Sequence, residues 1–160
     1  MAGETVIVSG LDELKRKLAE IPKAMRRRVL RNALAAGARE VRDTARRAAP
    51  VLNLGVSLKA PYRKPGTVKQ AISVRTSKLD RKDGNVGVFI NVRPAKKGQR
   101  GAKSTTDPFY WRFLEFGTKK MAARSFLRGA SSRLPQALRI FEERIAKWVN
   151  ETDASGKVKP

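Results

Sequence analysis

The strongest constraint on the fold is a long apolar repeat that begins after Pro22 and stops before Pro50. Apolar side chains recur there every three to five positions, which is the spacing of one face of an α-helix. The helix is predicted to end before Pro50, because proline cannot continue it. Its apolar stripe is mostly alanine, with Gly37 inside it. Such small side chains let a second backbone approach closely, so we expect tight packing against a sheet or a neighbouring helix.

Two short segments further along the chain have the composition of β-strands. Residues 71–76 alternate apolar and polar side chains, and residues 86–92 are rich in β-branched residues. Asp83 and Gly84 lie between them and form a strong turn signal. The sequence therefore predicts a β-hairpin.

The remaining segments are shorter or more polar. Residues 4–9 predict a strand, residues 11–21 a short helix, and residues 93–106 a long, basic, flexible loop. Residues 1–150 are expected to form a single domain, and residues 151–160 a disordered tail. A second long helix is predicted from Ser131 onward, with an apolar stripe made of Leu134, Leu138, Phe141, Ile145, Trp148 and Val149.

The charge of the chain is strongly unbalanced. It has 36 Lys and Arg residues against 14 Asp and Glu, a net charge of +22. Such a surface attracts polyanions without sequence preference and in a salt-sensitive way. The alternatives are a basic face that is simply solvated, or one that meets an acidic partner protein. The candidate polyanion contacts are Arg26, Arg27, Arg28, Arg31, Lys96, Lys97, Arg100 and Lys103.

The residue types that are missing narrow the function further. The chain has no Cys and no His, which excludes disulfides, thiolate metal sites and the commonest general base. No catalytic motif or phosphate-binding loop is present, so we expect no enzyme activity, no metal and no cofactor. A His-free nuclease built on Asp, Glu and Lys is the weakest alternative. No segment approaches the ~20 apolar residues of a membrane span, and no signal peptide is apparent.

The most specific part of the sequence is an aromatic stretch, residues 109–130, which holds four of the six Phe residues. If its first eight residues are helical, Phe113, Leu114 and Phe116 are predicted to lie in the core. Arg112 and Glu115 are close enough to pair with each other or with a neighbouring chain. Base stacking is a competing use for the aromatic side chains. The predicted protein-interface residues are Tyr110, Trp111, Arg112, Glu115, Gly117, Thr118, Arg124, Phe126 and Arg128.

Several motifs in this sequence resemble one family of bacteriophage proteins. Residues 109–110, 114–118 and 123–130 resemble its YA…EFGT…ARPFLRPA signature. Residues 10–14 resemble its opening GLDEL, and residues 49–51 the APV that follows its long helix. The chain departs from the signature where Ser and Gly replace two prolines. On these motifs the chain resembles a neck or tail-completion family of long-tailed phages, which includes proteins similar to phage lambda tail protein Z.

The resemblance implies a small α+β domain, in which a long N-terminal amphipathic helix and a C-terminal helix pack on a small antiparallel β-sheet. It implies a structural virion protein at the head-proximal end of the tail, assembled in the host cytoplasm. The expected form is a homo-oligomeric ring, hexameric by resemblance. The expected partners are tail-terminator, tail-tube or head-closure proteins, with DNA passing nearby but not bound specifically. The alternative is a small basic nucleic-acid-binding protein.

Overall fold

A computed structural model describes residues 16, 19, 23–51, 64–77 and 85–151 of the chain. The predicted strand at residues 4–9 and the Asp83–Gly84 turn lie outside these residues, as do most of the predicted helix at 11–21 and all but the first residue of the predicted tail.

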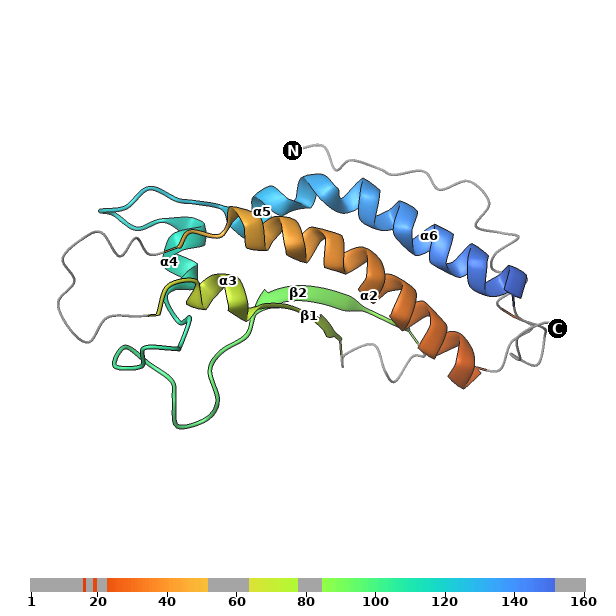
Figure 1. The fold of residues 1–160 in the computed structure, drawn as a ribbon, viewed down its shortest axis with the longest axis horizontal. Coiled ribbons are helices and arrows are strands. Elements are labelled where there is room, and N and C mark those ends of the chain that lie inside the picture. Colours follow the sequence, from red (N-terminus) through yellow and green to blue (C-terminus); the bar gives the residue numbers. More distant parts are fainter. Residues whose placement is uncertain (1–15, 17–18, 20–22, 52–63, 78–84, 152–160) are drawn as a thin grey trace.

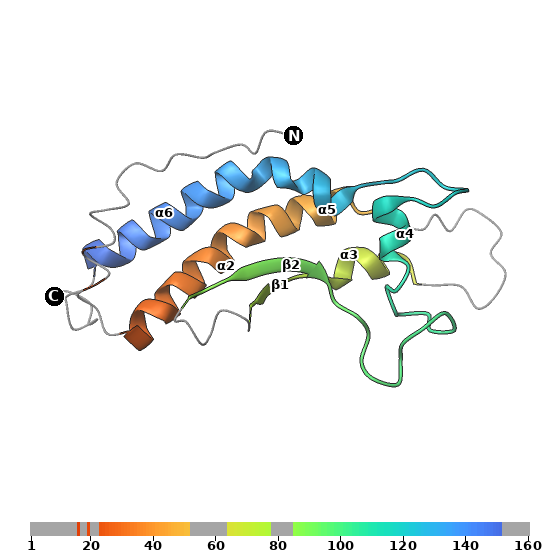
Figure 2. The ribbon, with the colours of Figure 1, turned by 180° about the vertical axis from the view of Figure 1, so that it is seen from behind.

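Two long helices and a two-stranded sheet form the body of the molecule (Figure 1). Helix α2 spans Lys23–Ala48 and helix α6 spans Leu134–Glu151. In both views α2 lies between α6 on one side and the sheet on the other (Figures 1 and 2). This arrangement confirms the predicted α+β class with two amphipathic helices and a small antiparallel sheet. It also confirms that α2 starts after Pro22 and ends before Pro50.

The sheet consists of strand β1, Ile72–Thr76, and strand β2, Val88–Val92. The strands are antiparallel, with Ile72 opposite Val92 and Thr76 opposite Val88. Ile72 and Val92 are buried and belong to the same core cluster as Val41 and Ala45 of α2. The predicted pair of antiparallel strands is therefore confirmed, and its apolar face packs on α2.

The small residues of α2 allow a very close approach, as their size predicted. A Cβ atom added to Gly37 would lie 2.2 Å from the carbonyl oxygen of Ala137 in α6. Ala33 of α2 and Ile145 of α6 are both buried in the second core cluster of the described residues. The neighbour at this point is a helix, which decides between the two alternatives that the sequence left open.

One member of the predicted apolar stripe of α6 is exposed, while the others are buried or half-buried. Leu134, the first residue of α6, is exposed, whereas Ile145 is fully buried. The reason lies in the preceding segment, where Phe126 and Ala130 pack against Val41 and Ala45 of α2. The face of α2 opposite the start of α6 is therefore already covered, and the prediction for Leu134 is wrong.

Four short elements complete the described chain: α3 (Thr67–Ala71), α4 (Trp111–Phe116), α5 (Phe126–Gly129) and the 3₁₀ helix η2 (Ala130–Arg133). Residues 93–106 contain no helix or strand, as predicted. The buried carboxylate of Asp107 accepts hydrogen bonds from the backbone N–H groups of Ala95, at 3.2 Å, and Gly101, at 2.7 Å. These bonds hold Ala95 and Gly101 against Asp107 and so fix the path of the loop at both residues.

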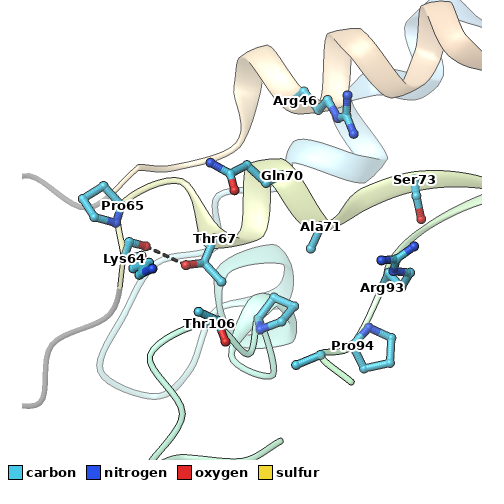
Figure 3. Close-up of a pocket in the computed structure, with 12 residues that line it drawn as sticks. Arg46, Lys64, Pro65, Thr67, Gln70, Ala71, Ser73, Arg93, Pro94 and Thr106 are labelled. Carbon is cyan, nitrogen blue, oxygen red and sulfur yellow. Dashed lines mark hydrogen bonds between the residues drawn. The ribbon is translucent and has the colours of Figure 1, made fainter. Parts of the chain in front are cut away.

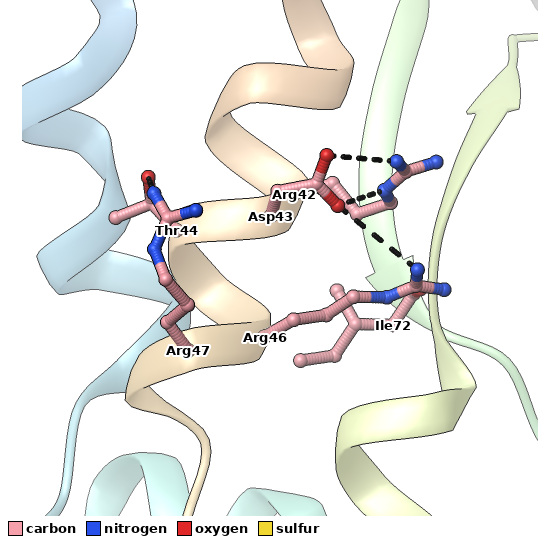
Figure 4. A network of polar contacts seen from close by, with 6 residues as sticks. All are labelled: Arg42, Asp43, Thr44, Arg46, Arg47 and Ile72. Atoms are coloured by element: carbon pink, nitrogen blue, oxygen red, sulfur yellow. Dashed lines mark hydrogen bonds and ion pairs between the residues drawn. The ribbon is translucent and has the colours of Figure 1, made fainter.

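Some arginines on the basic face of α2 form hydrogen bonds and ion pairs within the molecule (Figure 4). Arg42 donates two hydrogen bonds to Asp43, at 2.8 and 2.9 Å. The Nε and Nη2 atoms of Arg46 both donate to the carbonyl oxygen of Ile72, at 3.1 and 2.8 Å. Arg46 therefore ties the end of α2 to the start of β1. The basic face of α2 thus forms ion pairs with Asp43 of the same helix.

The hydrogen bonds from Arg42 lower the pKa of Asp43 below 3.8. Because the native pKa is lowered, the carboxylate stabilises the fold above about pH 4, and this contribution is lost as the pH falls through the native pKa. The Asp43 side chain is 42% exposed, so the contribution is expected to be at most about 1 kcal/mol. Urea unfolding should therefore show that Asp43→Asn is less stable than the parent at pH 6, and that the difference shrinks as the pH falls below about 4. A difference that is independent of pH would contradict this assignment.

Candidate functional site

Helix α4 is short and ends at a glycine that no other residue can replace easily. Gly117 has a φ of 76° and a ψ of −177°, and its N–H bonds to the carbonyl oxygen of Phe113. A side chain there would be strained by the positive φ. Its Cβ would also lie 2.8 Å from the carbonyl oxygen of Met121 and from the backbone nitrogen of Ala123. The chain therefore turns at Gly117, with a positive φ and an extended ψ.

A tight hairpin follows this turn. The N–H of Thr118 donates to the carbonyl oxygen of Met121 at 2.8 Å, and the N–H of Met121 donates back at 3.2 Å. Lys119 and Lys120 form its exposed tip. In Figure 1 this segment projects from the end of the molecule, beyond α4.

Glu115 is the buried polar anchor of this region. Its side chain is 2% exposed, and its two carboxylate oxygens accept the N–H groups of Leu127 and Arg128, each at 2.9 Å. These N–H groups lie in the first turn of α5, where a helix has no partners of its own to offer. The Ser125 hydroxyl also donates to the carbonyl oxygen of Glu115, at 3.0 Å. Glu115 therefore fixes the position of α5 relative to α4.

This arrangement corrects two predictions for Glu115. It does not pair with Arg112, whose guanidinium lies 5.5 Å from the centroid of the Trp111 ring instead. It is also not a surface residue, because both carboxylate oxygens are used inside the chain. The sequence carries no signal for this contact, since the partners are backbone groups that every residue type except proline provides.

The structure also redistributes the aromatic residues between core and surface. Phe126 is 1% exposed and packs in the core with Val41 and Ala45, so its predicted place on the surface is wrong. Phe113 and Phe116 are 51% and 61% exposed, so their predicted place in the core is wrong as well. The physical reason is that Phe126 fills the space beside α2 that they would have needed.

The inner side of α4 is formed by other residues. Tyr110, Trp111 and Leu114 are half-buried and pack against the core cluster. The prediction that Leu114 helps to fill the core is confirmed. Tyr110 and Trp111 keep only part of their surface available for a partner.

Exposed apolar side chains gather on the outer side of α4 and on the hairpin. We call Phe113, Phe116 and Met121 the α4 patch; all three are exposed. The guanidinium of Arg128 lies 5.6 Å from the centroid of the Phe116 ring. Glu115 is the single acidic residue between positions 109 and 130, and it is buried. The exposed residues that accompany the patch are therefore basic or neutral; they include Arg112, Thr118, Lys119, Lys120, Arg124 and Arg128.

The predicted polyanion contacts fall into two separate groups. Arg27, Arg28 and Arg31 line a hollow of about 400 Å³ between α2 and the end of β1, and Arg26 lies on the same turn of α2. Lys96, Lys97, Arg100 and Lys103 are exposed on the loop between β2 and α4. The start of α2 and this loop lie at opposite ends of the molecule in both views (Figures 1 and 2). The structure does not bring the eight residues together on one surface.

Among the residues that the structure describes, no helix is long and apolar enough to cross a membrane. These residues contain no cluster of three or more His, Cys, Asp or Glu side chains that could hold a metal ion.

The chain was compared with known proteins. No curated protein and no solved structure matches it. A sequence model of one family, described as "Bacteriophage HK97-gp10, putative tail-component", matches residues 12–117. The matched segment includes α2, the sheet and α4 and ends at Gly117; the hairpin, α5 and α6 follow it. Because the match covers more than half of the 160 residues, the chain belongs to the HK97-gp10-like family of phage tail components.

Proposed function

We propose that this tail component completes the head-proximal end of the tail and helps to join it to the head, as a ring of identical subunits. A hexamer is the ring size that the resemblance to the neck and tail-completion proteins suggests. The expected neighbours are tail-terminator, tail-tube or head-closure proteins. The role is structural, without catalysis, and DNA passes nearby without being a specific ligand.

The observation that carries this proposal is the α4 patch. Folding buries Phe126 but leaves Phe113 and Phe116 more than half exposed. Large exposed aromatic side chains beside arginines are typical of the residues that dominate protein–protein binding energy. In a tail component, the most direct use of such a surface is contact with a neighbouring subunit or virion protein.

The proposal predicts that polar residues in the α4 patch prevent joining while leaving the fold intact. In phage carrying Phe113→Ser with Phe116→Ser, electron microscopy should show at least about a tenfold drop in joined particles, because loss of interface anchors weakens binding by about 2 kcal/mol or more each. Purified protein should unfold within about 0.5 kcal/mol of the parent, since both side chains are exposed.

The matched control is Phe89→Ser, which replaces an exposed phenylalanine (42%) on the sheet, away from α4. It should leave particle joining unchanged. If heads and tails of the double variant join normally, the α4 patch is not the joining surface.

The second candidate is a small nucleic-acid-binding protein, which the net charge of +22 favours. Two basic groups at opposite ends of the molecule do not form one continuous track for a duplex. Duplex DNA binding that survives about 0.2 M salt would support this candidate, because non-specific phosphate contacts weaken steeply there.

A further inference from the structure

A hollow separate from the α4 patch lies beside the end of α2 (Figure 3). Its volume is about 640 Å³, and it is formed by α2, α3, the start of β1 and the segment that follows β2. Three cations line it, Arg46, Lys64 and Arg93, and none of the lining residues is acidic. Arg46 and Lys64 are 18 positions apart in the sequence, Lys64 and Arg93 are 29 apart, and folding brings all three to one hollow.

The guanidinium of Arg46 is held in place before any ligand arrives. Its Nε and Nη2 atoms donate to the carbonyl oxygen of Ile72, while Asp43 lies 4.0 Å from Nη1. A guanidinium carries five N–H donors, so donors remain for an incoming oxyanion. Asp43 offsets part of the charge, but its side chain is 42% exposed and mainly bonded to Arg42. Because Arg46 is fixed by the fold, little side-chain freedom is lost when it binds.

A buried hydroxyl lies beside the same hollow. The Oγ atom of Ser73 has no hydrogen-bond partner among the described residues, although it is shielded from solvent. Buried polar atoms are nearly always paired, so an unpaired one needs an explanation. Figure 3 shows Ser73, which lies in β1, next to Arg93, which follows the end of β2. Because the hydroxyl is shielded, a rotation of the Ser73 side chain toward the hollow would give it a ligand oxygen as a partner.

The other walls of the hollow have an apolar part made of prolines, beside the polar side chains of Thr67, Gln70 and Thr106. Pro65, Pro94 and Pro108 line it, and the loop behind it is fixed by the hydrogen bonds of Asp107 to Ala95 and Gly101. These surfaces suit the carbon stem of a side chain or an extended backbone. The hollow therefore combines fixed donors for an oxyanion with partly apolar walls.

We propose that this hollow binds an acidic peptide segment of a partner protein, with its carboxylates held by Arg46, Lys64 and Arg93. Arginine can bind a carboxylate through two parallel hydrogen bonds. The proline side chains that line the hollow fit the methylene groups of aspartate or glutamate. A nucleic acid backbone is instead tracked by cations spread along a groove, whereas these three cations line one hollow. The inference does not rest on the joining role, because binding is measured on the free protein.

The test is the binding of a fluorescent hexaglutamate peptide, capped at both ends, to the full chain at about 0.15 M salt. Fluorescence anisotropy should show saturable binding, and a hexaglutamine peptide should not bind. The double variant Lys64→Gln with Arg93→Gln should bind about tenfold more weakly, because two charged hydrogen-bond donors are lost. Both residues are exposed, so the fold should persist.

The matched control is Lys96→Gln with Lys97→Gln. It removes the same charge from exposed positions close in sequence to Arg93 that do not line the hollow. Its dissociation constant should change less than about twofold. Equal weakening in the two double variants would show a general charge effect and overturn the proposal, as would the absence of peptide binding. It would also be overturned if a short DNA duplex displaced the peptide at lower concentration and depended on the same two residues.

Discussion

Replacing Glu115 by alanine is expected to lower the free energy of unfolding by about 3 kcal/mol. The variant loses the two hydrogen bonds that the carboxylate accepts, which leaves the N–H groups of Leu127 and Arg128 without this partner. A hydrogen bond to a charged group contributes about 1.5–3 kcal/mol, and the loss of a helix-capping side chain alone about 1 kcal/mol. The free energy can be measured by urea unfolding followed through tryptophan fluorescence.

The control for this prediction is Glu143→Ala, which removes an exposed carboxylate from α6 and should change stability by at most about 0.5 kcal/mol. Glu115→Gln should be intermediate, because the amide keeps one acceptor oxygen but turns an NH₂ group toward the second N–H. If Glu115→Ala were as stable as Glu143→Ala, the carboxylate would not be the link between α4 and α5.

Glu115 and the α4 patch should then fail in different ways. Glu115 positions α4 on α5 from inside, so its removal is expected to reduce joining by loosening the surface that carries Phe113 and Phe116. The patch residues themselves have exposed side chains, so their replacement should reduce joining in a protein of normal stability. A pair of measurements, unfolding and joining, separates the residue that positions the surface from the residues that make contact.

The parts of the fold that sequence predicts well are those governed by local rules. Helix α2 has seven turns of consistent periodicity between two prolines, and the observed helix, Lys23–Ala48, fits between them. The strands at Ile72–Thr76 and Val88–Val92 were predicted in the same way, from alternation and β-branched residues. In each case the signal repeats often enough that one exception does not change the outcome.

The candidate site was predicted only in part, because its signals are short and its partners are distant in sequence. Helix α4 has six residues, and two of them are phenylalanines whose burial a pattern of under two turns cannot assign. The choice is made by Phe126, ten residues after α4 ends, which fills the space beside Val41 and Ala45. The same holds for the hollow lined by Arg46, Lys64 and Arg93. The fold brings these residues to one place, and no local motif in the sequence marks them.

The close contact between α2 and α6 gives the other large effect: Gly37→Ala is expected to destabilise the fold by about 3 kcal/mol or more. The new Cβ would lie 2.2 Å from the carbonyl oxygen of Ala137. Each of these atoms is bonded directly to the backbone of a helix, so neither can rotate away. Alanine favours a helix over glycine by about 1 kcal/mol, so the intrinsic preference acts in the opposite direction. The clash outweighs it, because α2 and α6 must move apart along a packed interface. Urea unfolding should show the loss as a lower midpoint.

Gly129→Ala provides the comparison that isolates this contact. Gly129 also lies in a helix, with a φ of −60°, but a Cβ there would meet nothing within 4 Å. Its replacement should leave stability unchanged or raise it by up to about 1 kcal/mol. The two variants introduce the same methyl group into the same kind of backbone, so the difference between them measures the cost of separating α2 from α6. Equal stabilities would mean that the two helices do not approach as closely as Gly37 and Ala137 indicate.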